Sequence, residues 1–103
     1  MQVKLSDEPS KSGVASSELP NLAEQIVKLP KLRLRGLMAI PAATADYPEQ
    51  RRSFSKLQGL LLQLQKQHPP ADTLSMGMSG DLEAAVVEGS TLVRVGTDIF
   101  GAR

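Results

Sequence analysis

The stretch SMGMSGDLEAAVVEGSTLVRVGTDIFGAR, residues 75–103, contains two strand-and-turn units in close succession. The first is an apolar strand that ends in the turn Gly77–Asp81 and leads into a helix near residues 81–88. The second is a strand near residues 91–96 that ends in the turn Gly96–Gly101. A strand, a helix and a second strand in this order are typical of a parallel sheet, because the helix returns the chain to the starting edge.

The residues before this stretch repeat the alternation of strand and helix. We expect strands near residues 2–5, 32–40 and 73–77, and helices near residues 17–29 and 49–67. The sequence therefore predicts an α/β fold with four parallel strands separated by helices, in a single domain over residues 1–103. Four such strands could form a small open sheet or the C-terminal half of a (β/α)8 TIM barrel, and spacing alone does not separate these alternatives.

Half of a barrel would leave a strand edge open on each side, at residues 3–5 and 92–95. Unpaired backbone N–H and C=O groups on such edges pair readily with another chain. Self-association as a homodimer through these edges is therefore one way in which the predicted half-barrel could be completed.

Composition narrows the class of function. The chain has 12 basic and 11 acidic residues, a formal charge of +1 and three aromatic residues, so neither a nucleic-acid surface nor a base-stacking platform is expected. It has no cysteine and one histidine, which leaves no thiolate metal site and no hydrolase triad. No apolar run approaches the roughly 20 residues that cross a bilayer. We expect a cytoplasmic chain that is not an enzyme and has no metal, membrane or nucleic-acid partner.

Candidate chemistry lies in the turns that follow the strands, because parallel α/β sheets bind ligands at the carboxyl ends of their strands. After the strand at 73–77, the Ser79 hydroxyl and the free N–H groups of the next helix could hold a phosphate. After the last strand, Gly96 lets the backbone approach a ligand closely, and Thr97 adds a hydroxyl. Barrel enzymes often place a phosphate site between the loops after their last two strands. A small phosphate-bearing ligand is therefore the expected partner.

Each of these residues also has a purely structural interpretation. Ser79 or Asp81 can cap the following helix, and Gly96 can mark the end of a strand. Arg94 lies between two valines, so its guanidinium needs either an ion-pair partner or a polar cavity. The residues alone leave these alternatives open.

Three segments, SDEPSKSG at 6–13, LRLRGLMAIP at 32–41 and DTLSMGMSGDLEAAVVEGSTLVRVGTDIFGAR at 72–103, closely resemble the pyridoxal phosphate homeostasis family, the YggS-like proteins. That family is similar to the barrel domain of alanine racemase standing alone. It binds pyridoxal 5′-phosphate (PLP) and controls its supply, with no established turnover. The resemblance implies a non-catalytic PLP-binding protein of vitamin B6 homeostasis.

The resemblance also implies roles for particular residues. Ser79 and the backbone of Gly96 and Thr97 would hold the cofactor phosphate, Arg94 would face the pyridine nitrogen, and Met38 would line the pocket. An arginine beside that nitrogen keeps it unprotonated and weakens the ring as an electron sink. This arrangement suits a carrier better than a pyridoxal enzyme.

The resemblance covers only the C-terminal half of the family's length. The family's cofactor lysine lies on the first barrel strand, which has no counterpart here, and none of the lysines occupies its position: Lys4, Lys11, Lys28, Lys31, Lys56 and Lys66. We therefore expect weak or non-covalent PLP binding through the phosphate contacts. The alternative is a structural half-barrel that self-associates, or pairs with a missing half, and binds no cofactor by itself. A racemase-like enzyme is disfavoured, because no acid–base pair replaces the lysine.

Overall fold

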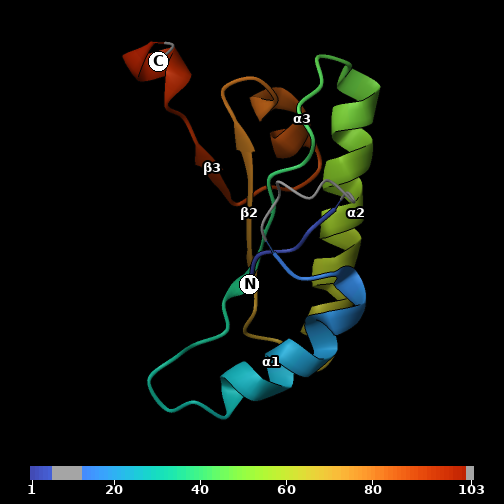
Figure 1. Ribbon diagram of the computed structural model, residues 1–103, viewed down its shortest axis with the longest axis vertical. Coiled ribbons are helices and arrows are strands. Elements are labelled where there is room, and N and C mark those ends of the chain that lie inside the picture. Colours follow the sequence, from blue (N-terminus) through green and yellow to red (C-terminus); the bar gives the residue numbers. More distant parts are fainter. Residues whose placement is uncertain (6–12, 102–103) are drawn as a thin grey trace.

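The computed structural model describes residues 1–5 and 13–101, except for the side chains of Thr97 and Asp98. Three parallel strands form one sheet in the order β1-β2-β3 (Figure 1). This arrangement confirms the α/β class and the parallel sheet. In chain order the elements are a 3-10 helix Ser16–Glu18, α1 Leu19–Val27, β1 Gly36–Met38, α2 Tyr47–Gln65, β2 Thr73–Met78, α3 Leu82–Val87, β3 Leu92–Arg94 and α4 Thr97–Phe100.

The expectation of four strands is wrong for the described residues. The N-terminal segment, expected as a strand over 2–5, makes only isolated one-residue bridges, with Met38 and with Val14. The Val3 amide donates to the Met38 carbonyl at 2.8 Å, but the next amide, that of Lys4, donates to the Val14 carbonyl at 2.8 Å. Successive amides of an extended chain point to opposite edges, so the segment lies between Met38 and Val14 with one bridge to each, and no continuous ladder forms along β1.

The strand expected over residues 32–40 is restricted to β1. The segment beside residues 32–35 is the turn that contains Pro69 and Pro70, whose nitrogens carry no hydrogen for a ladder. Strand β2 therefore begins only at Thr73, whose amide donates to the Arg35 carbonyl at 2.8 Å. The chain on the amino side of Arg35 has no strand beside it.

Strand β3 is also shorter than the expected range 91–96. Before it, the Thr91 amide donates to the Leu74 carbonyl at 3.0 Å, and side-chain hydrogen bonds add to this contact. The Leu74 amide donates to Thr91 Oγ1 at 2.7 Å. The Ser90 hydroxyl donates to the Met76 carbonyl at 2.6 Å. After Arg94 the chain leaves the sheet and forms α4, where the sequence indicated only a turn.

Replacing Thr91 with valine is expected to lower the free energy of unfolding by about 1–3 kcal/mol, because the partly buried Leu74 amide loses its acceptor while the side-chain shape is kept. Thr44→Val is the matched control. The hydroxyl of Thr44 accepts the Asp46 amide at 3.1 Å at an exposed position, where water can replace it. Urea unfolding of both variants checks the difference, and equal losses would contradict the role assigned to Thr91.

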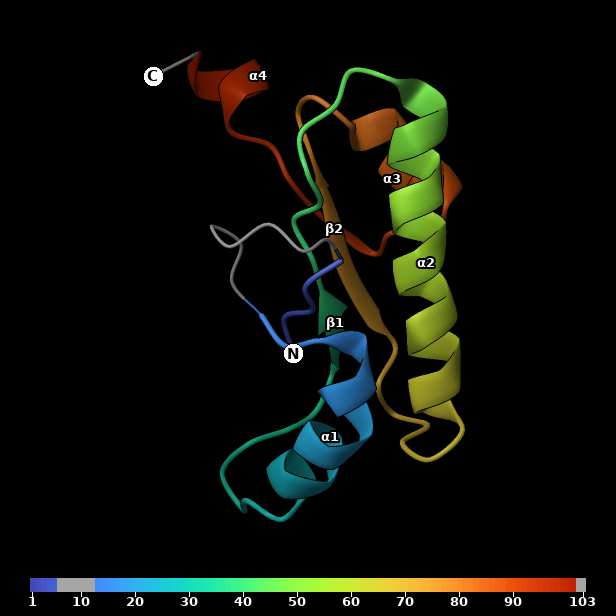
Figure 2. The same ribbon diagram turned by 45° about the vertical axis from the view of Figure 1, so that its right-hand side comes forward.

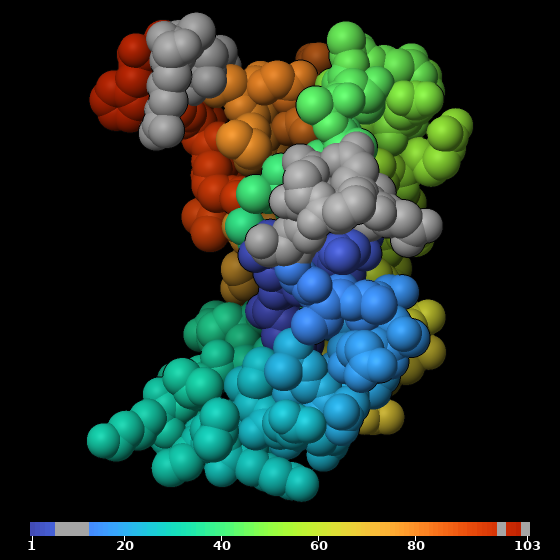
Figure 3. Space-filling view, viewed as in Figure 1, coloured from blue at the N-terminus to red at the C-terminus, as the bar shows by residue number. Residues whose placement is uncertain are grey.

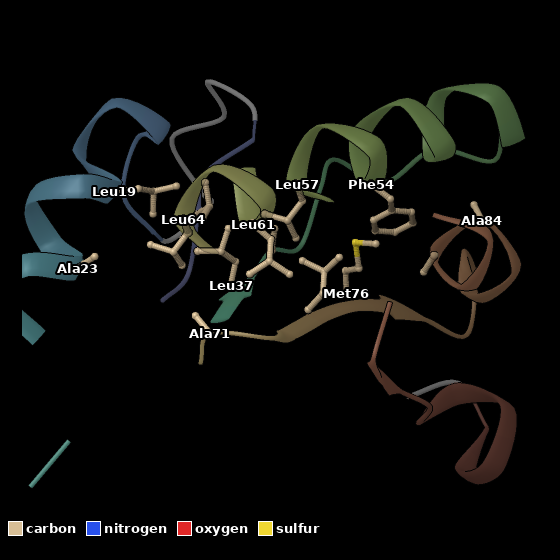
Figure 4. Packing of buried hydrophobic residues seen from close by; sticks show 14 residues of the cluster. Leu19, Ala23, Leu37, Phe54, Leu57, Leu61, Leu64, Ala71, Met76 and Ala84 are labelled. Atoms are coloured by element: carbon tan, nitrogen blue, oxygen red, sulfur yellow. The ribbon is translucent and has the colours of Figure 1, made fainter. Parts of the chain in front are cut away.

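The core lies between the helices and one face of the sheet. Apolar residues recur along α2 at helical spacing, which turns one stripe of the helix toward β1 and β2. Figure 4 shows Phe54 beside Met76 and Ala84, where α2, β2 and α3 meet. The buried apolar side chains are Val3, Leu19, Ala23, Leu37, Ala39, Phe54, Leu57, Leu61, Leu64, Ala71, Leu74, Met76, Ala84 and Ala85.

The described helices cover the sheet on one side only, as Figures 1 and 2 show for α2 and α3. The radius of gyration is 14.0 Å, whereas a compact domain of about 100 residues has about 13 Å. The principal extents are 40 × 26 × 26 Å, and α4 and the loop after α1 project from the body in Figure 3. None of the described helices is both long enough and apolar enough to span a membrane.

Candidate functional site

The carboxyl ends of β2 and β3 lie toward one end of the molecule, together with the start of α2, the start of α3 and α4 (Figures 1 and 2). In the sheet, Met78 pairs with Arg94. The turn after β2 and the turn after β3 therefore leave the sheet side by side. Ser79 is one residue beyond Met78, and Gly96 is two residues beyond Arg94. This is the end at which parallel sheets bind ligands.

The turn after β2 is closed by two hydrogen bonds between its ends. The Asp81 amide donates to the Met78 carbonyl at 3.1 Å, and the Met78 amide donates to Asp81 Oδ1 at 2.7 Å. The Asp81 carboxylate thus closes the turn and does not cap α3. Ser79, which is half-buried, and Gly80, which is exposed, form the tip of this turn.

The turn after β3 begins at Gly96. Its carbonyl accepts the amides of Ile99 at 3.0 Å and Phe100 at 2.7 Å, and this starts α4. A Cβ built on Gly96 would meet no heavy atom within 4 Å, and its φ is not positive. The local backbone therefore does not require glycine, and the open space beside Gly96 would admit a ligand close to the chain. Thr97 is the first residue of α4, but its hydroxyl lies outside the described side chains.

Arg94 carries a buried donor atom with no acceptor. Its Nη2 donates to the Ala39 carbonyl at 3.4 Å, whereas its Nε is shielded from solvent and has no hydrogen-bond partner among the described residues. The ion pairs found in the described part of the chain do not include Arg94. The structural interpretation of Arg94 as one half of a salt bridge is therefore not supported there. Unpaired buried donors are rare because each one costs free energy, and they are typical of sites completed by a ligand.

The sheet register places Met38 and Arg94 on the same face. Met38 pairs with Ser75, and Ser75 pairs with Leu92. Arg94 is two residues beyond Leu92, so its side chain leaves the sheet on that same side. The buried core side chain Leu37, next to Met38, faces the other way, toward α2. The guanidinium of Arg94 thus extends over the face of the sheet opposite α2 and reaches the carbonyl of Ala39, the residue after Met38.

Gln50 is a residue of this region that the sequence interpretation missed. It is the one buried polar residue in the described part of the chain, 7% exposed, in the first turns of α2. Its Nε2 donates to the carbonyl of Thr44 at 2.8 Å and to that of Gly80 at 3.3 Å. A signal was present in the sequence: Gln50 lies four residues before Phe54, on the apolar stripe of α2, where a polar side chain needs a partner.

Ser79 also borders a groove on the helix side of the sheet. This groove has a volume of about 570 Å³ and lies between the start of α2 and the start of α3. Its lining includes Tyr47, Gln50 and Val86. The structure therefore brings Met38 and Arg94 together on one face, whereas Ser79 and Gly96 stand at the end of the sheet in neighbouring turns.

The ion pairs of the described residues lie outside this site. Arg51 Nε contacts Glu88 Oε2 at 2.8 Å, which ties α2 to the end of α3, and the hydrogen bond and charge of Glu88 raise the pKa of Arg51. At the amino end of the sheet, Arg35 lies 3.2 Å from Asp72, and its hydrogen bond and charge lower the pKa of that carboxyl. Among the described residues, no three His, Cys, Asp or Glu side chains gather as metal ligands.

Sequence comparison places this fold in a family. A sequence model of the family described as alanine racemase, N-terminal domain, matches residues 1–103. The chain belongs to this family. The whole chain is also 57% identical to a pyridoxal phosphate homeostasis protein of Vibrio alginolyticus and 50% identical to one of Escherichia coli K12. This member of the alanine racemase N-terminal domain family spans 44% of the length of each of these relatives.

Solved structures of this type agree with the fold. The chain superposes on PipY of Synechococcus elongatus PCC7942 without PLP with a TM-score of 0.88 and 38% identity, covering 98% of this chain and 48% of PipY. Against PipY with PLP bound, the TM-score is 0.80 and the identity 34%, covering 97% of this chain and 49% of PipY. This family member therefore corresponds to part of a longer alanine-racemase-like barrel domain.

Proposed function

We propose that this chain binds PLP without a covalent bond and serves intracellular PLP homeostasis without catalysing a reaction. The observation that carries the proposal is the buried Nε of Arg94, which has no acceptor among the described residues and belongs to a guanidinium that reaches the Ala39 carbonyl, next to Met38. A pyridine nitrogen is a hydrogen-bond acceptor of the kind that this donor lacks. The similarity to named PLP homeostasis proteins, and to a PipY structure that contains PLP, supports the same ligand.

The described residues fit the parts of this cofactor. Arg94 would donate to the pyridine nitrogen, Met38 would pack against the ring, and the turns that hold Ser79 and Gly96–Thr97 would bind the phosphate. The open space beside Gly96 suits a ligand oxygen that approaches a backbone amide. When bound, PLP supplies an electron-accepting ring. A guanidinium at the ring nitrogen leaves that nitrogen unprotonated and weakens this property, which favours storage over turnover.

Non-covalent binding follows from the lysines. None of the lysines in this sequence is expected at the position of the family's cofactor lysine, and Lys11 lies outside the described residues. Lys4 lies close in sequence to the bridge between Gln2 and Met38 of β1. It is therefore the described lysine to check for a covalent PLP adduct after borohydride reduction. We expect no specific PLP adduct on Lys4.

Gly96→Ala tests the phosphate contact. The added methyl group meets no described atom, so the free energy of unfolding should change by less than about 0.5 kcal/mol. The methyl group would occupy the approach to the backbone, so PLP should bind at least about tenfold more weakly, measured by titration calorimetry. Gly59→Ala, in α2 and away from the strand ends, should leave PLP affinity unchanged. Wild-type PLP affinity in Gly96→Ala would reject this contact.

A second candidate function is self-association of a half-barrel, and the exposed apolar surface beside β3 favours it. Leu92 is 54% exposed, Ile99 67% and Phe100 85%, all on or just after the last strand of the sheet. Apolar side chains beside an open strand edge are typical of surfaces that pair with another chain. A second copy of this chain, adding its own strands, would cover them.

Leu92→Lys is expected to shift the chain from dimer to monomer in sedimentation velocity, because a lysine on a strand edge opposes pairing. Val87→Lys is the matched control, since Val87 is also 54% exposed but lies on α3, away from that edge. It should leave the dimer intact. A wild-type chain that sediments as a monomer at every concentration would exclude this second function.

A further inference from the structure

The buried amide of Gln50 joins two loops that come from different strands. Thr44 lies in the loop between β1 and α2, and Gly80 lies at the tip of the turn between β2 and α3. The Nε2 group of Gln50 donates to the carbonyl oxygens of both, at 2.8 Å and 3.3 Å, so each of its N–H groups has a partner. An amide at 7% exposure would be costly without these bonds.

The bond to Gly80 fixes the orientation of one peptide group. Gly80 has open space around it, and glycine backbones rotate more freely than any other. The carbonyl of the Gly80–Asp81 peptide is held by Gln50, while the N–H of the same peptide donates to the Met78 carbonyl at 3.1 Å. With both polar groups of this peptide held, its carbonyl oxygen stays directed toward α2. A flipped peptide would turn that oxygen away from α2, where its partial negative charge could oppose a bound phosphate.

We propose that Gln50 is a positioning residue that gives the site its preference for a phosphorylated vitamer over the unphosphorylated one. It acts through the Met78–Asp81 turn and does not touch the ligand. The inference rests on the proposed function, because it takes the Ser79 turn as part of the phosphate site. Gln50, a buried residue near the start of α2, would thus help to determine which ligand binds, although it lies behind the turn and not in contact with the ligand.

The test compares PLP with pyridoxal, which lacks the phosphate, by titration calorimetry on the whole chain. Gln50→Met keeps the length of the side chain and removes both donors. It should weaken PLP binding about tenfold, or about 1.4 kcal/mol, and leave pyridoxal binding unchanged. Gln58→Met, the same substitution on the same helix, should change neither affinity, because Gln58 lies beside Gly89 and away from the turn. Gln50→Asn keeps a polar amide but is one methylene group shorter, so it should not reach both carbonyls, and it decides the question if Gln50→Met does not fold.

The outcomes separate the inference from the function on which it rests. A wild-type chain that binds PLP no better than pyridoxal would reject the phosphate site itself. A wild-type preference for PLP that survives in Gln50→Met and Gln50→Asn would overturn the role of Gln50 and leave the phosphate site standing. Equal losses of affinity for PLP and for pyridoxal would also overturn the role of Gln50. Such losses would indicate that the substitution disturbs α2 in general and does not act through the turn beside the phosphate.

Discussion

Replacing Gly36 with alanine is expected to abolish the folded state. A Cβ at this position would overlap the backbone carbonyl oxygen of Thr73, and the φ of Gly36 is +155°, which side chains rarely adopt. The two residues pair directly in the register of β1 and β2, so the overlap can be relieved only by separating the strands. We expect a loss of more than about 4 kcal/mol, beyond the range of most single substitutions. Circular dichroism during urea titration should show no cooperative transition.

Gly59→Ala makes the same chemical change where the opposite result is expected. Gly59 lies exposed within α2, and a Cβ there would meet no atom within 4 Å. Alanine should raise the free energy of unfolding by about 1 kcal/mol through its higher helix propensity. A Gly36→Ala chain that unfolds like the wild type would show that β1 and β2 do not pair in this register.

Replacing Arg94 with methionine is expected to weaken PLP binding while the fold keeps its stability. Nε has no acceptor among residues 1–5 and 13–101, and the bond from Nη2 to the Ala39 carbonyl is long, at 3.4 Å, so removal of the guanidinium loses little. A charged donor to a ligand contributes about 1.5–3 kcal/mol, so PLP affinity should fall roughly 10- to 150-fold.

Arg51→Met should show the reverse pattern. Arg51 pairs with Glu88 at 2.8 Å between α2 and α3, away from the candidate site. Its loss should lower the thermal midpoint slightly and leave PLP affinity unchanged. If both arginine variants bind PLP as the wild type does, Arg94 has no part in the site. If Arg94→Met unfolds at a much lower temperature, its guanidinium is structural.

Local patterns in the sequence predicted the helices and the class of the sheet. Apolar residues from Phe54 to Leu64 recur at helical spacing, and α2 starts and ends within two residues of the expected range 49–67. Leu74 and Met76 alternate with half-buried residues, which matches a strand covered by helices on one face. These features depend only on neighbours within one element, so a single sequence contains them.

The lengths of the strands depend on what lies beside them, and that information is not local. Strand β1 begins only at Gly36 because Pro69 and Pro70 precede its neighbour β2, and the N-terminal segment makes a single bridge on each edge, to Met38 and to Val14. The order of elements was sufficient to place the turns of Ser79 and Gly96 at the carboxyl end of the sheet. It could not show that Arg94 Nε has no acceptor among the described residues, because this depends on which groups reach it in space. The burial of Gln50 was predictable from its place on the apolar stripe, but its two carbonyl partners were not.

Equilibrium titration of the chain with PLP and with pyridoxal, followed by borohydride reduction and peptide mass spectrometry, tests the central claim most directly. The account predicts saturable binding of PLP, tighter than that of pyridoxal, with no lysine specifically modified after reduction. Equal binding of the two vitamers, or one lysine such as Lys4 carrying a stoichiometric reduced adduct, would contradict a site that holds the cofactor by its phosphate and ring nitrogen alone.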